Sequence, residues 1–452
     1  MELMKKHRMH ILLPVILVVL SLVGSLIYTG LQAGGSASSH VSLGQQYLNN
    51  LDYSAAILEF SNAISLDPTN KDARIGLAEA YSQTGNYDFA AEVLEEVIDE
   101  EALDPEITQQ LIQVYEDGGK HGAAIQLIID LIAQPDEDAY YEQLQEALEA
   151  LYSLPRTYAQ GTDQALLLNA GGVSSRGSNT LGQLGTDRNL GSRDQVQNDY
   201  ASAEFTGNAL AVYCAGRTSY VIDENHDLWA AGENRWGQMG LSYGTVLPES
   251  GWIRLTDTGD VAAVAGGSGT LLVLKTDGSL WTSGGSSTQT LTRSTEFGTV
   301  IRIFTSENYS YVLNGDGKLY YQCSTDSEAV WYKVSSDVID FTAWGSSVYW
   351  LNSSGNLCSY YGFSHPEDWT WMEDGSVKPS ISICAMAFNG SSLIFQSMDG
   401  GLYRLDGSGS LTQIQTDSPV ANVYAEAGNA VVVLEDGSIL LWENYADDPV
   451  TL

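Results

Sequence analysis

The chain has 452 residues, enough for about three domains, and carries 57 acidic against 20 basic side chains, a formal net charge of −37. Because so acidic a chain repels phosphate backbones, generic nucleic-acid binding is excluded. The charge favours a basic partner, divalent cations or simply a solvated acidic surface.

The N-terminus predicts a membrane segment. Residues 1–10 form a basic tail with Lys5, Lys6 and Arg8. Residues 11–31 form a run of 21 uncharged residues. As a helix, such a run is long enough to cross a hydrocarbon core of about 30 Å. The basic flank predicts that the tail stays in the cytoplasm and that the bulk of the chain lies outside.

A cleaved signal peptide is the alternative for the same segment. The residues Leu31-Gln32-Ala33 form a possible small-residue cleavage site. The apolar run, however, is longer than the roughly 7–15 residues usual in signal peptides, so an uncleaved signal anchor is favoured. Residues 32–38 are rich in Gly, Ala and Ser, which predicts a flexible linker.

Paired amphipathic helices are predicted over residues 39–153. Two sets of residues recur at an interval of 34, namely Tyr47, Tyr81 and Tyr115, and Ala56, Ala90 and Ala124. Each unit predicts two helices that cross at the alanine, because only a small side chain lets the backbones approach. Residues 139–152 predict a final capping helix.

The 34-residue unit resembles the tetratricopeptide repeat (TPR) family. The positions that carry the resemblance in the first copy are Leu43, Gly44, Tyr47, Ala56, Phe60, Ala63 and Pro68. The resemblance implies an α-solenoid of three repeats whose inner helices line a peptide-binding groove. By register, the candidate groove residues are Gln45, Asn49, Asp72, Glu79, Gln83, Glu106, Gln113, Glu116 and Asp117.

The predicted groove is acidic. Residues 40–155 hold 23 acidic and three basic side chains, a net charge of −20. The groove lacks the basic side chains with which some members of the family hold a C-terminal carboxylate. We therefore expect a basic or amide-rich peptide as its ligand. The alternative is a spacer that holds the next domain away from the membrane.

Short β-strands with a longer period occupy residues 156–452. A polar turn, often Asp-Gly, is followed by a short apolar strand, and the positions that mark this strand are 173, 228, 280, 319, 357, 402 and 439. A period of roughly 40–50 residues is typical of a propeller with one four-stranded sheet per repeat. Seven copies predict seven blades.

Two of these repeats continue into a loop of the type Gly-x-Asn-x-x-Gly-Gln-Leu-Gly, at residues 177–185 and 232–240. Glycine permits a tight turn, and Asn and Gln side chains can hydrogen-bond its backbone. The pattern resembles the regulator-of-chromosome-condensation family, which implies a seven-bladed β-propeller. The nucleotide exchange and chromatin binding of its founding member are not expected, because this chain is acidic and has a membrane signal. Secreted bacterial relatives include a protein inhibitor of β-lactamases, which implies a docking face.

All ten tryptophans lie in this part of the chain. Those placed on predicted strands, where packing is expected, include Trp229, Trp252, Trp281, Trp331 and Trp442. Those placed in loops, which are candidate anchors on a propeller face, are Trp236, Trp369 and Trp371. For this last group, packing within the propeller is the alternative.

The sequence carries no recognisable catalytic or metal motif. Cys214, Cys323, Cys358 and Cys384 show no C-x-x-C spacing, and buried free thiols are favoured over one or two disulfides. The six histidines form no H-x-x-x-H pair, and no G-x-S-x-G or phosphate-binding loop is present. We therefore expect no enzymatic activity, no cofactor and no metal.

These patterns together predict a multidomain protein, α plus all-β, with a transmembrane helix, a TPR α-solenoid and a seven-bladed β-propeller. The expected function is a non-enzymatic scaffold in the membrane of a bacterial-type cell, which binds proteins or peptides through the groove and a propeller face. The alternative is a propeller that inhibits or regulates an extracellular enzyme. A glycan-binding or catalytic propeller is the third hypothesis.

Overall fold

The computed structural model describes residues 35–452 with gaps at 99–103, 133–137, 171, 188–190, 192–195, 242–250, 268, 285–287, 307, 325–329, 353–354, 362–382 and 399. The predicted cytoplasmic tail and membrane helix, residues 1–10 and 11–31, lie outside the described residues, as do Trp369 and Trp371. Among the helices of the described part, none is long and apolar enough to cross a membrane.

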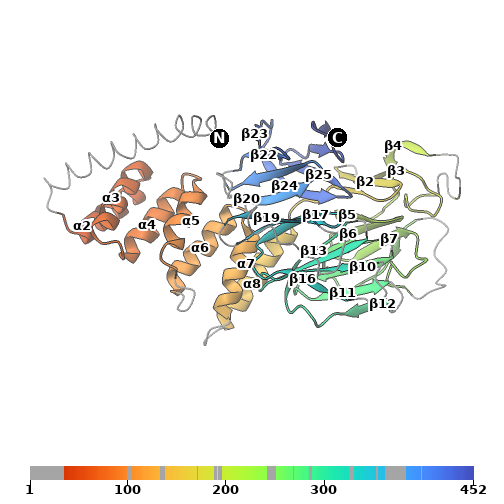
Figure 1. Cartoon of the computed structure of the whole chain (residues 1–452), viewed down its shortest axis with the longest axis horizontal. Coiled ribbons are helices and arrows are strands. Elements are labelled where there is room, and N and C mark those ends of the chain that lie inside the picture. The colour runs from red at the N-terminus through yellow and green to blue at the C-terminus, as the bar shows by residue number, and fades with distance from the viewer. Residues whose placement is uncertain are drawn as a thin grey trace. The chain divides into compact units, whose positions relative to one another are not determined.

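Contacts divide the chain into two compact units. The first, which we call the helical unit, ends at Asp117, and the second, the propeller unit, is Gly118–Leu452. Helices of the helical unit are α2 (Ala37–Asn49), α3 (Tyr53–Leu66), α4 (Lys71–Ser82), α5 (Tyr87–Glu95) and α6 (Pro105–Asp117) (Figure 1). The propeller unit opens with α7 (His121–Ile132) and α8 (Asp138–Tyr152).

Small residues set the packing of the helical unit, as the 34-residue repeat predicts. Phe60 on α3 is fully buried. A Cβ added at Gly44 on α2 would lie 2.8 Å from the Phe60 ring, and one added at Gly76 on α4 would lie 2.3 Å from it. Ala56 and Ala90 are also fully buried. Glycine and alanine therefore let three successive helices close around one aromatic ring.

The helices begin where the sequence supplies side-chain caps. Asp52 Oδ1 accepts a hydrogen bond from the Ala55 amide at 3.2 Å, at the start of α3. Asn70 Oδ1 accepts one from the Ala73 amide at 2.9 Å, at the start of α4. Each cap satisfies one of the first amides of a helix, which have no partner within the helix itself.

The strands form seven antiparallel sheets, the blades of a propeller. Blades 1 to 3 are β1 (Tyr158–Gln160), β2 (Gln164–Asn169), β3 (Gly172–Gly177), β4 (Gln197–Ser202); β5 (Ala209–Ala215), β6 (Thr218–Asp223), β7 (Leu228–Gly232), β8 (Ile253–Arg254); and β9 (Val261–Gly266), β10 (Thr270–Lys275), β11 (Leu280–Gly284), β12 (Thr288–Arg293). Blade 4 is β13 (Val300–Ser306), β14 (Tyr309–Asn314), β15 (Leu319–Cys323) and β16 (Tyr332–Ser335).

Blade 5 has three described strands, β17 (Asp340–Trp344), β18 (Ser347–Leu351) and β19 (Leu357–Tyr361). Blade 6 is β20 (Ile383–Phe388), β21 (Ser392–Ser397), β22 (Leu402–Asp406) and β23 (Leu411–Ile414). Blade 7 is β24 (Val420–Glu426), β25 (Asn429–Leu434), β26 (Ile439–Trp442) and β27 (Val450–Thr451). The seven predicted blades are confirmed, and each marker position of the sequence repeat lies at or next to the start of the third strand of its blade.

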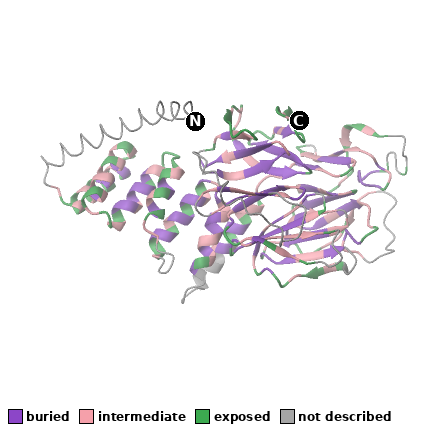
Figure 2. Ribbon diagram, viewed as in Figure 1, coloured by how far each residue is buried: buried purple, intermediate pink, exposed green. Residues whose placement is uncertain are grey.

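The core of the propeller lies between neighbouring blades, where buried strand residues face each other (Figure 2). All six residues of β6 and all six of β25 are buried. One core cluster joins blades 1 and 7, through Tyr158, Tyr424 and their neighbours, so the first and last blades pack together and close the ring. Closure rests on side chains, because each of these two blades is built from its own consecutive strands.

Every blade uses the same strand order, with its first strand innermost, so the inner strands all run the same way. Their starts gather at one end of the central channel, which we call the start end. The turns that follow the inner strands gather at the other end, the turn end. The loops between third and fourth strands, including residues 177–185 and 232–240, also belong to the turn end.

Candidate functional site

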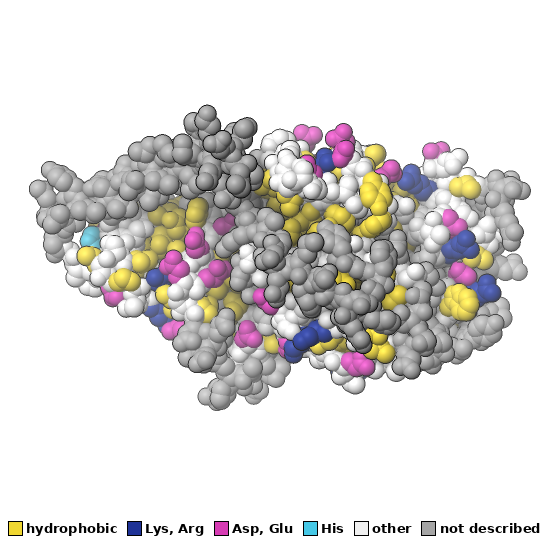
Figure 3. All heavy atoms as spheres, viewed as in Figure 1, with side chains coloured by type: hydrophobic (Ala, Val, Ile, Leu, Met, Phe, Trp, Pro, Cys, Tyr) yellow, Lys and Arg dark blue, Asp and Glu magenta, His cyan; other side chains and the backbone are white. Residues whose placement is uncertain are grey.

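The nine candidate groove residues are well placed to meet a ligand. Eight of them are exposed, and Glu116 is half-buried. They lie on α2, α4 and α6, except for Gln83, which immediately follows α4. Figure 3 shows acidic side chains on the visible face of the helical unit. These residues are accessible to a ligand, and both the groove and its ligand stay predictions.

Some groove residues already contact other side chains. The Gln113 side-chain amide donates to Asp117 at 2.9 Å, one helical turn away. Lys71 Nζ lies 2.6 Å from Glu106 and 2.9 Å from Asp104, which links the start of α4 to the start of α6. No pattern in the sequence indicates this link. A basic ligand would compete with Lys71 for Glu106.

Each of the two Gly-x-Asn loops lies between the third and fourth strands of its own blade and contacts the next blade. Asn179 Oδ1 accepts from the Leu184 amide at 2.9 Å, which fixes the loop from within. The carbonyl of Gln183 accepts a hydrogen bond from Ser219 Oγ of blade 2 at 2.7 Å. In the second loop, the carbonyl of Gly237 accepts from Ser283 Oγ of blade 3 at 3.1 Å. The motif residues therefore hold the ring together.

Glycine is required where each loop begins. Gly177 and Gly232 both have φ of +111°. A Cβ at Gly177 would lie 2.2 Å from the Asp163 carbonyl oxygen, and one at Gly232 would lie 2.4 Å from that of Arg217. Both the positive φ and the close approach exclude a larger residue.

Trp236 is the predicted face residue that the structure describes. It lies in the second Gly-x-Asn loop at the turn end and is 53% exposed. Its ring contacts the guanidinium of Arg235, whose Cζ lies 5.2 Å from the ring centroid. By contrast, Trp442 is buried, and Trp252 donates to the Ala203 carbonyl at 2.8 Å. An exposed aromatic side chain of this kind suits a protein contact.

The central channel contains a cavity that no pattern in the sequence indicates. This cavity has a volume of about 420 Å³, and residues along the whole length of the inner strands line it. Its lining includes Arg302 and Asp340, which lie near the start end, and Glu426 and Trp344, which end inner strands at the turn end. Arg156 precedes β1, and its side chain reaches along the channel to Glu426. Pockets of roughly 300–1,000 Å³ are typical of small-molecule sites.

Arg156 and Glu426 form an ion pair inside this channel. Arg156 precedes β1 and its guanidinium lies between two rings, 4.6 Å from the centroid of Tyr213 and 4.5 Å from that of Tyr424. Burial lowers the pKa of Arg156, but Glu426 and the tyrosines more than offset this and raise it. Burial raises the pKa of Glu426, and Arg156 opposes that rise. The pair joins the first and last blades.

A second ion pair, Arg302 with Asp340, joins blades 4 and 5. Pairing of β13 with β14 shifts by one residue between Val300 and Arg302, so that Ile301 forms a bulge. Such a bulge redirects the side chains that follow it. Burial, together with nearby Arg156, lowers the pKa of Arg302 to about 10, so its guanidinium stays charged at neutral pH.

Helices α7 and α8 lie at the start end of the channel. A Cβ added at Gly122, in the first turn of α7, would lie 2.3 Å from the Ile339 carbonyl oxygen just before β17. Tyr152 Oη, at the end of α8, donates to the Val300 carbonyl at 3.2 Å. Figure 1 shows both helices next to the propeller strands, and α8 contacts β9. The helical hairpin that the repeat spacing assigns to the solenoid therefore packs on the propeller.

All four cysteines are free thiols. All four are half-buried, whereas the sequence predicts buried thiols. For Cys214 and Cys384 the reason is the channel, because both lie on inner strands and line the cavity. Burial raises the pKa of the Cys214 thiol, so it stays protonated. Among the described residues, no group of three His, Cys, Asp or Glu side chains is placed to hold a metal ion.

Comparison with known proteins supports the repeat assignment of the helical unit. Residues 49–109 match the family model of the tetratricopeptide repeat. No curated protein sequence matches the chain.

Solved structures of other propellers resemble the chain weakly. Human WBSCR16 is 16% identical, with a TM-score of 0.48, over 64% of this chain and 86% of that one. Prp20p from Saccharomyces cerevisiae is 15% identical, with a TM-score of 0.48, over 67% of this chain and 88% of that one. YCF48 from Cyanidioschyzon merolae is 11% identical, with a TM-score of 0.39, over 65% and 96% of the two chains. The assignment of seven blades to this chain therefore rests on the strand pairing within its own structure.

Proposed function

We propose that the protein is a non-enzymatic scaffold that binds other proteins through its helical unit and its propeller. A TPR array followed by a propeller fits a protein–protein interaction scaffold. The observation that carries the proposal is the exposure of the candidate groove residues, together with their acidic character. A basic or amide-rich peptide is the ligand that this surface would attract.

In this proposal residues 11–31 anchor the protein in the cell membrane as a single pass, with the N-terminus in the cytoplasm and the bulk of the chain outside. The support is the uncharged run and its basic flank. Added protease should digest the propeller in intact cells, and the membrane fraction should contain the full-length mass. A mature chain that begins near residue 34 would show a cleaved signal peptide instead.

The groove is tested with the full-length protein as bait in solubilised membranes. The variant Glu79→Lys/Glu116→Lys reverses two groove charges, and Glu92→Lys reverses an exposed charge on α5 as the matched control. We expect the double variant to lose proteins that the wild type and the control retain, most clearly at low salt. If all three baits retain the same proteins, the helical unit is a spacer and its groove binds nothing.

The second candidate function is a propeller that docks on an extracellular enzyme and regulates it. The exposed Trp236 at the turn end favours this. Trp236→Ala should then abolish binding of one partner and leave the melting temperature of the protein unchanged. Trp252→Ala, which removes a tryptophan that packs in the fold, is the contrasting variant and should lower the melting temperature. A partner that binds Trp236→Ala as tightly as wild type would exclude this docking face.

A further inference from the structure

The central channel has the charge of a site for an anion, although the protein as a whole is strongly acidic. Among the described residues that line the cavity, the cations are Lys120, Arg156 and Arg302 and the anions are Asp340 and Glu426. The ratio is thus three to two in favour of cations, whereas the chain has 20 basic against 57 acidic side chains. A cleft with low-dielectric walls concentrates the field of the charges that line it.

Both acidic groups of the channel already have cationic partners. Asp340 pairs with Arg302, and Glu426 pairs with Arg156. Glu426 also accepts a hydrogen bond from the backbone amide of Gln160 at 3.2 Å. A cationic ligand would have to displace an arginine from a carboxylate and from the faces of two tyrosines. The channel is therefore a poor site for a cation.

Donor capacity remains inside the channel and at its start end. Arg156 Nε is buried and has no hydrogen-bond partner among the described residues. Nδ1 of His121, at the beginning of α7, is likewise buried without a partner there. A guanidinium offers five N–H donors in one plane, a geometry that suits a carboxylate. The N-terminus of α7 adds positive potential at the same end.

The remaining walls suit an apolar body. Tyr152, Phe304 and Trp344 line the cavity together with small residues such as Ala263 and Ala385. An aromatic wall contributes to binding through apolar burial and favourable ring contacts. N–H donors together with aromatic walls suit a ligand that has a negatively charged group on one side and an apolar body on the other.

We propose that the propeller channel is a binding site for a small organic anion, with its carboxylate against Arg156 and Arg302 and its apolar part along the aromatic wall. The site is separate from the protein-binding surfaces proposed above. It lies inside the ring, whereas the groove is on the helical unit and Trp236 is at the outer surface of the turn end. The helices α7 and α8 lie over the end that holds the carboxylate, so the ligand enters from the turn end.

The test uses the full-length protein and three probes that share one ring but differ in charge. The probes are benzoate, benzyl alcohol and benzamidine, which are anionic, neutral and cationic at pH 7. We expect benzoate to raise the melting temperature of the propeller unit and to change the tryptophan fluorescence, because Trp344 lines the cavity. Benzyl alcohol should bind at least about tenfold more weakly, since each factor of ten is about 1.4 kcal/mol. Benzamidine should not bind.

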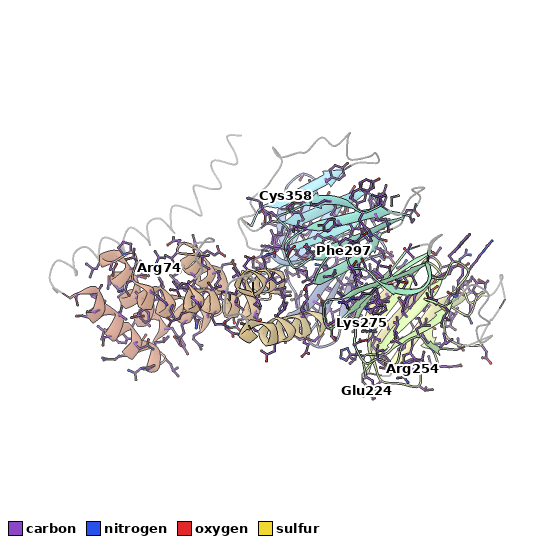
Figure 4. All side chains as sticks on the ribbon, turned by 90° about the horizontal axis from the view of Figure 1, so that it is seen from below. Arg74, Glu224, Arg254, Lys275, Phe297 and Cys358 are labelled. Atoms are coloured by element: carbon purple, nitrogen blue, oxygen red, sulfur yellow. The ribbon has the colours of Figure 1, made fainter. Side chains whose placement is uncertain are left out.

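Variants locate the site. Arg156→Gln/Glu426→Gln removes both charges but keeps groups that can hydrogen-bond each other, and Ala263→Leu fills the cavity. Either change should weaken benzoate binding at least about tenfold. Arg254→Gln is the matched control, because Arg254 pairs with Asp227 on blade 2, outside the cavity lining (Figure 4). It should leave benzoate binding unchanged.

Three outcomes would overturn the proposal. The first is no binding of benzoate at millimolar concentration. The second is binding of benzamidine or benzyl alcohol as tight as that of benzoate, because the site would then not select an anion. The third is benzoate binding that survives both cavity variants while each remains folded by circular dichroism, because the anion would then bind elsewhere.

Discussion

The helical unit and the propeller unit place their charged side chains differently. In the helical unit the charges lie mostly at the surface, and the interior is closed by Phe60 and small residues. In the propeller unit two arginine–carboxylate pairs lie in the channel, between blades. Charge at an exposed surface is available to partners and costs little to change. Charge inside a ring is expensive to leave unpaired, so a change there is expected to affect the stability of the fold.

The largest expected effect follows from breaking the pair that joins the first and last blades. Arg156→Leu would leave Glu426 buried without its cation, which should destabilise the propeller unit by about 3–5 kcal/mol. Hydrogen–deuterium exchange, resolved by peptide, would report loss of protection in β1 and β24. The double variant Arg156→Leu/Glu426→Leu should recover most of the loss. A single variant as stable as wild type would show that apolar packing alone closes the ring.

A smaller effect is expected from the buried arginine of the helical unit. Arg74 on α4 is 7% exposed (Figure 4). It donates to the carbonyls of Pro68 at 3.1 Å and Val93 at 2.9 Å, and to Glu96 at 2.9 Å. Arg74→Met keeps the aliphatic part but removes these donors. The helical unit should lose about 1.5–3 kcal/mol, the range for hydrogen bonds to charged groups.

Denaturant unfolding followed by exchange in α4 and α5 would measure that loss. Arg74→Lys is a useful second variant. It keeps the positive charge, but its ammonium group lacks the planar fork of donors with which the guanidinium reaches all three acceptors. It should lie between wild type and Arg74→Met. If Arg74→Lys is as stable as wild type, the charge matters and the geometry does not.

The sequence reveals the repeats because each repeat is local. The landmark strands and the 34-residue spacing both depend on residues within one blade or one pair of helices, so periodicity alone predicts them. The Gly-x-Asn loops are predicted for the same reason. Their contacts with the next blade, such as Ser219 Oγ with Gln183, follow from the fold and not from the motif.

The channel pair could not be predicted in this way. Arg156 and Glu426 are 270 positions apart. Neither belongs to the repeated phrase, because Arg156 precedes the first blade and Glu426 ends the inner strand of the last. Only closure of the ring brings them together. The packing of α7 could not be predicted either. The 34-residue spacing assigns α7 to the solenoid, whereas in the structure it contacts Ile339 and other residues of the propeller.

The stability of the propeller unit should depend on pH through His121, which lies at the start of α7. Burial lowers the pKa of His121 in the folded protein below its ordinary value near 6.5. As the pH falls below that value, the unfolded chain takes up the proton first, so the propeller unit loses stability. The slope is at most about 1.4 kcal/mol per pH unit for one group. Between pH 7.5 and pH 5.5, the free energy of unfolding should fall less for His121→Gln than for wild type. Equal losses would mean that carboxylates alone set the acid sensitivity.

The smallest effect is expected at an exposed ion pair of the helical unit. Lys71 contacts Asp104 and Glu106, and all three side chains are substantially exposed. Water and salt screen such pairs, and ordering long side chains costs entropy. Lys71→Met should therefore leave the unfolding midpoint of the helical unit unchanged within error. Arg74→Met lies on the same helix, so it serves as the matched buried case.

Lys71→Met also sharpens the comparison in function. Because it frees Glu106, it should increase the affinity of the groove for a basic peptide while stability stays constant. The opposite pattern, lost stability with unchanged binding, would place Lys71 among the structural charges. An exposed ion pair of the helical unit would then contribute to stability as the channel pairs do, and exposure alone would not separate the charges of the two units.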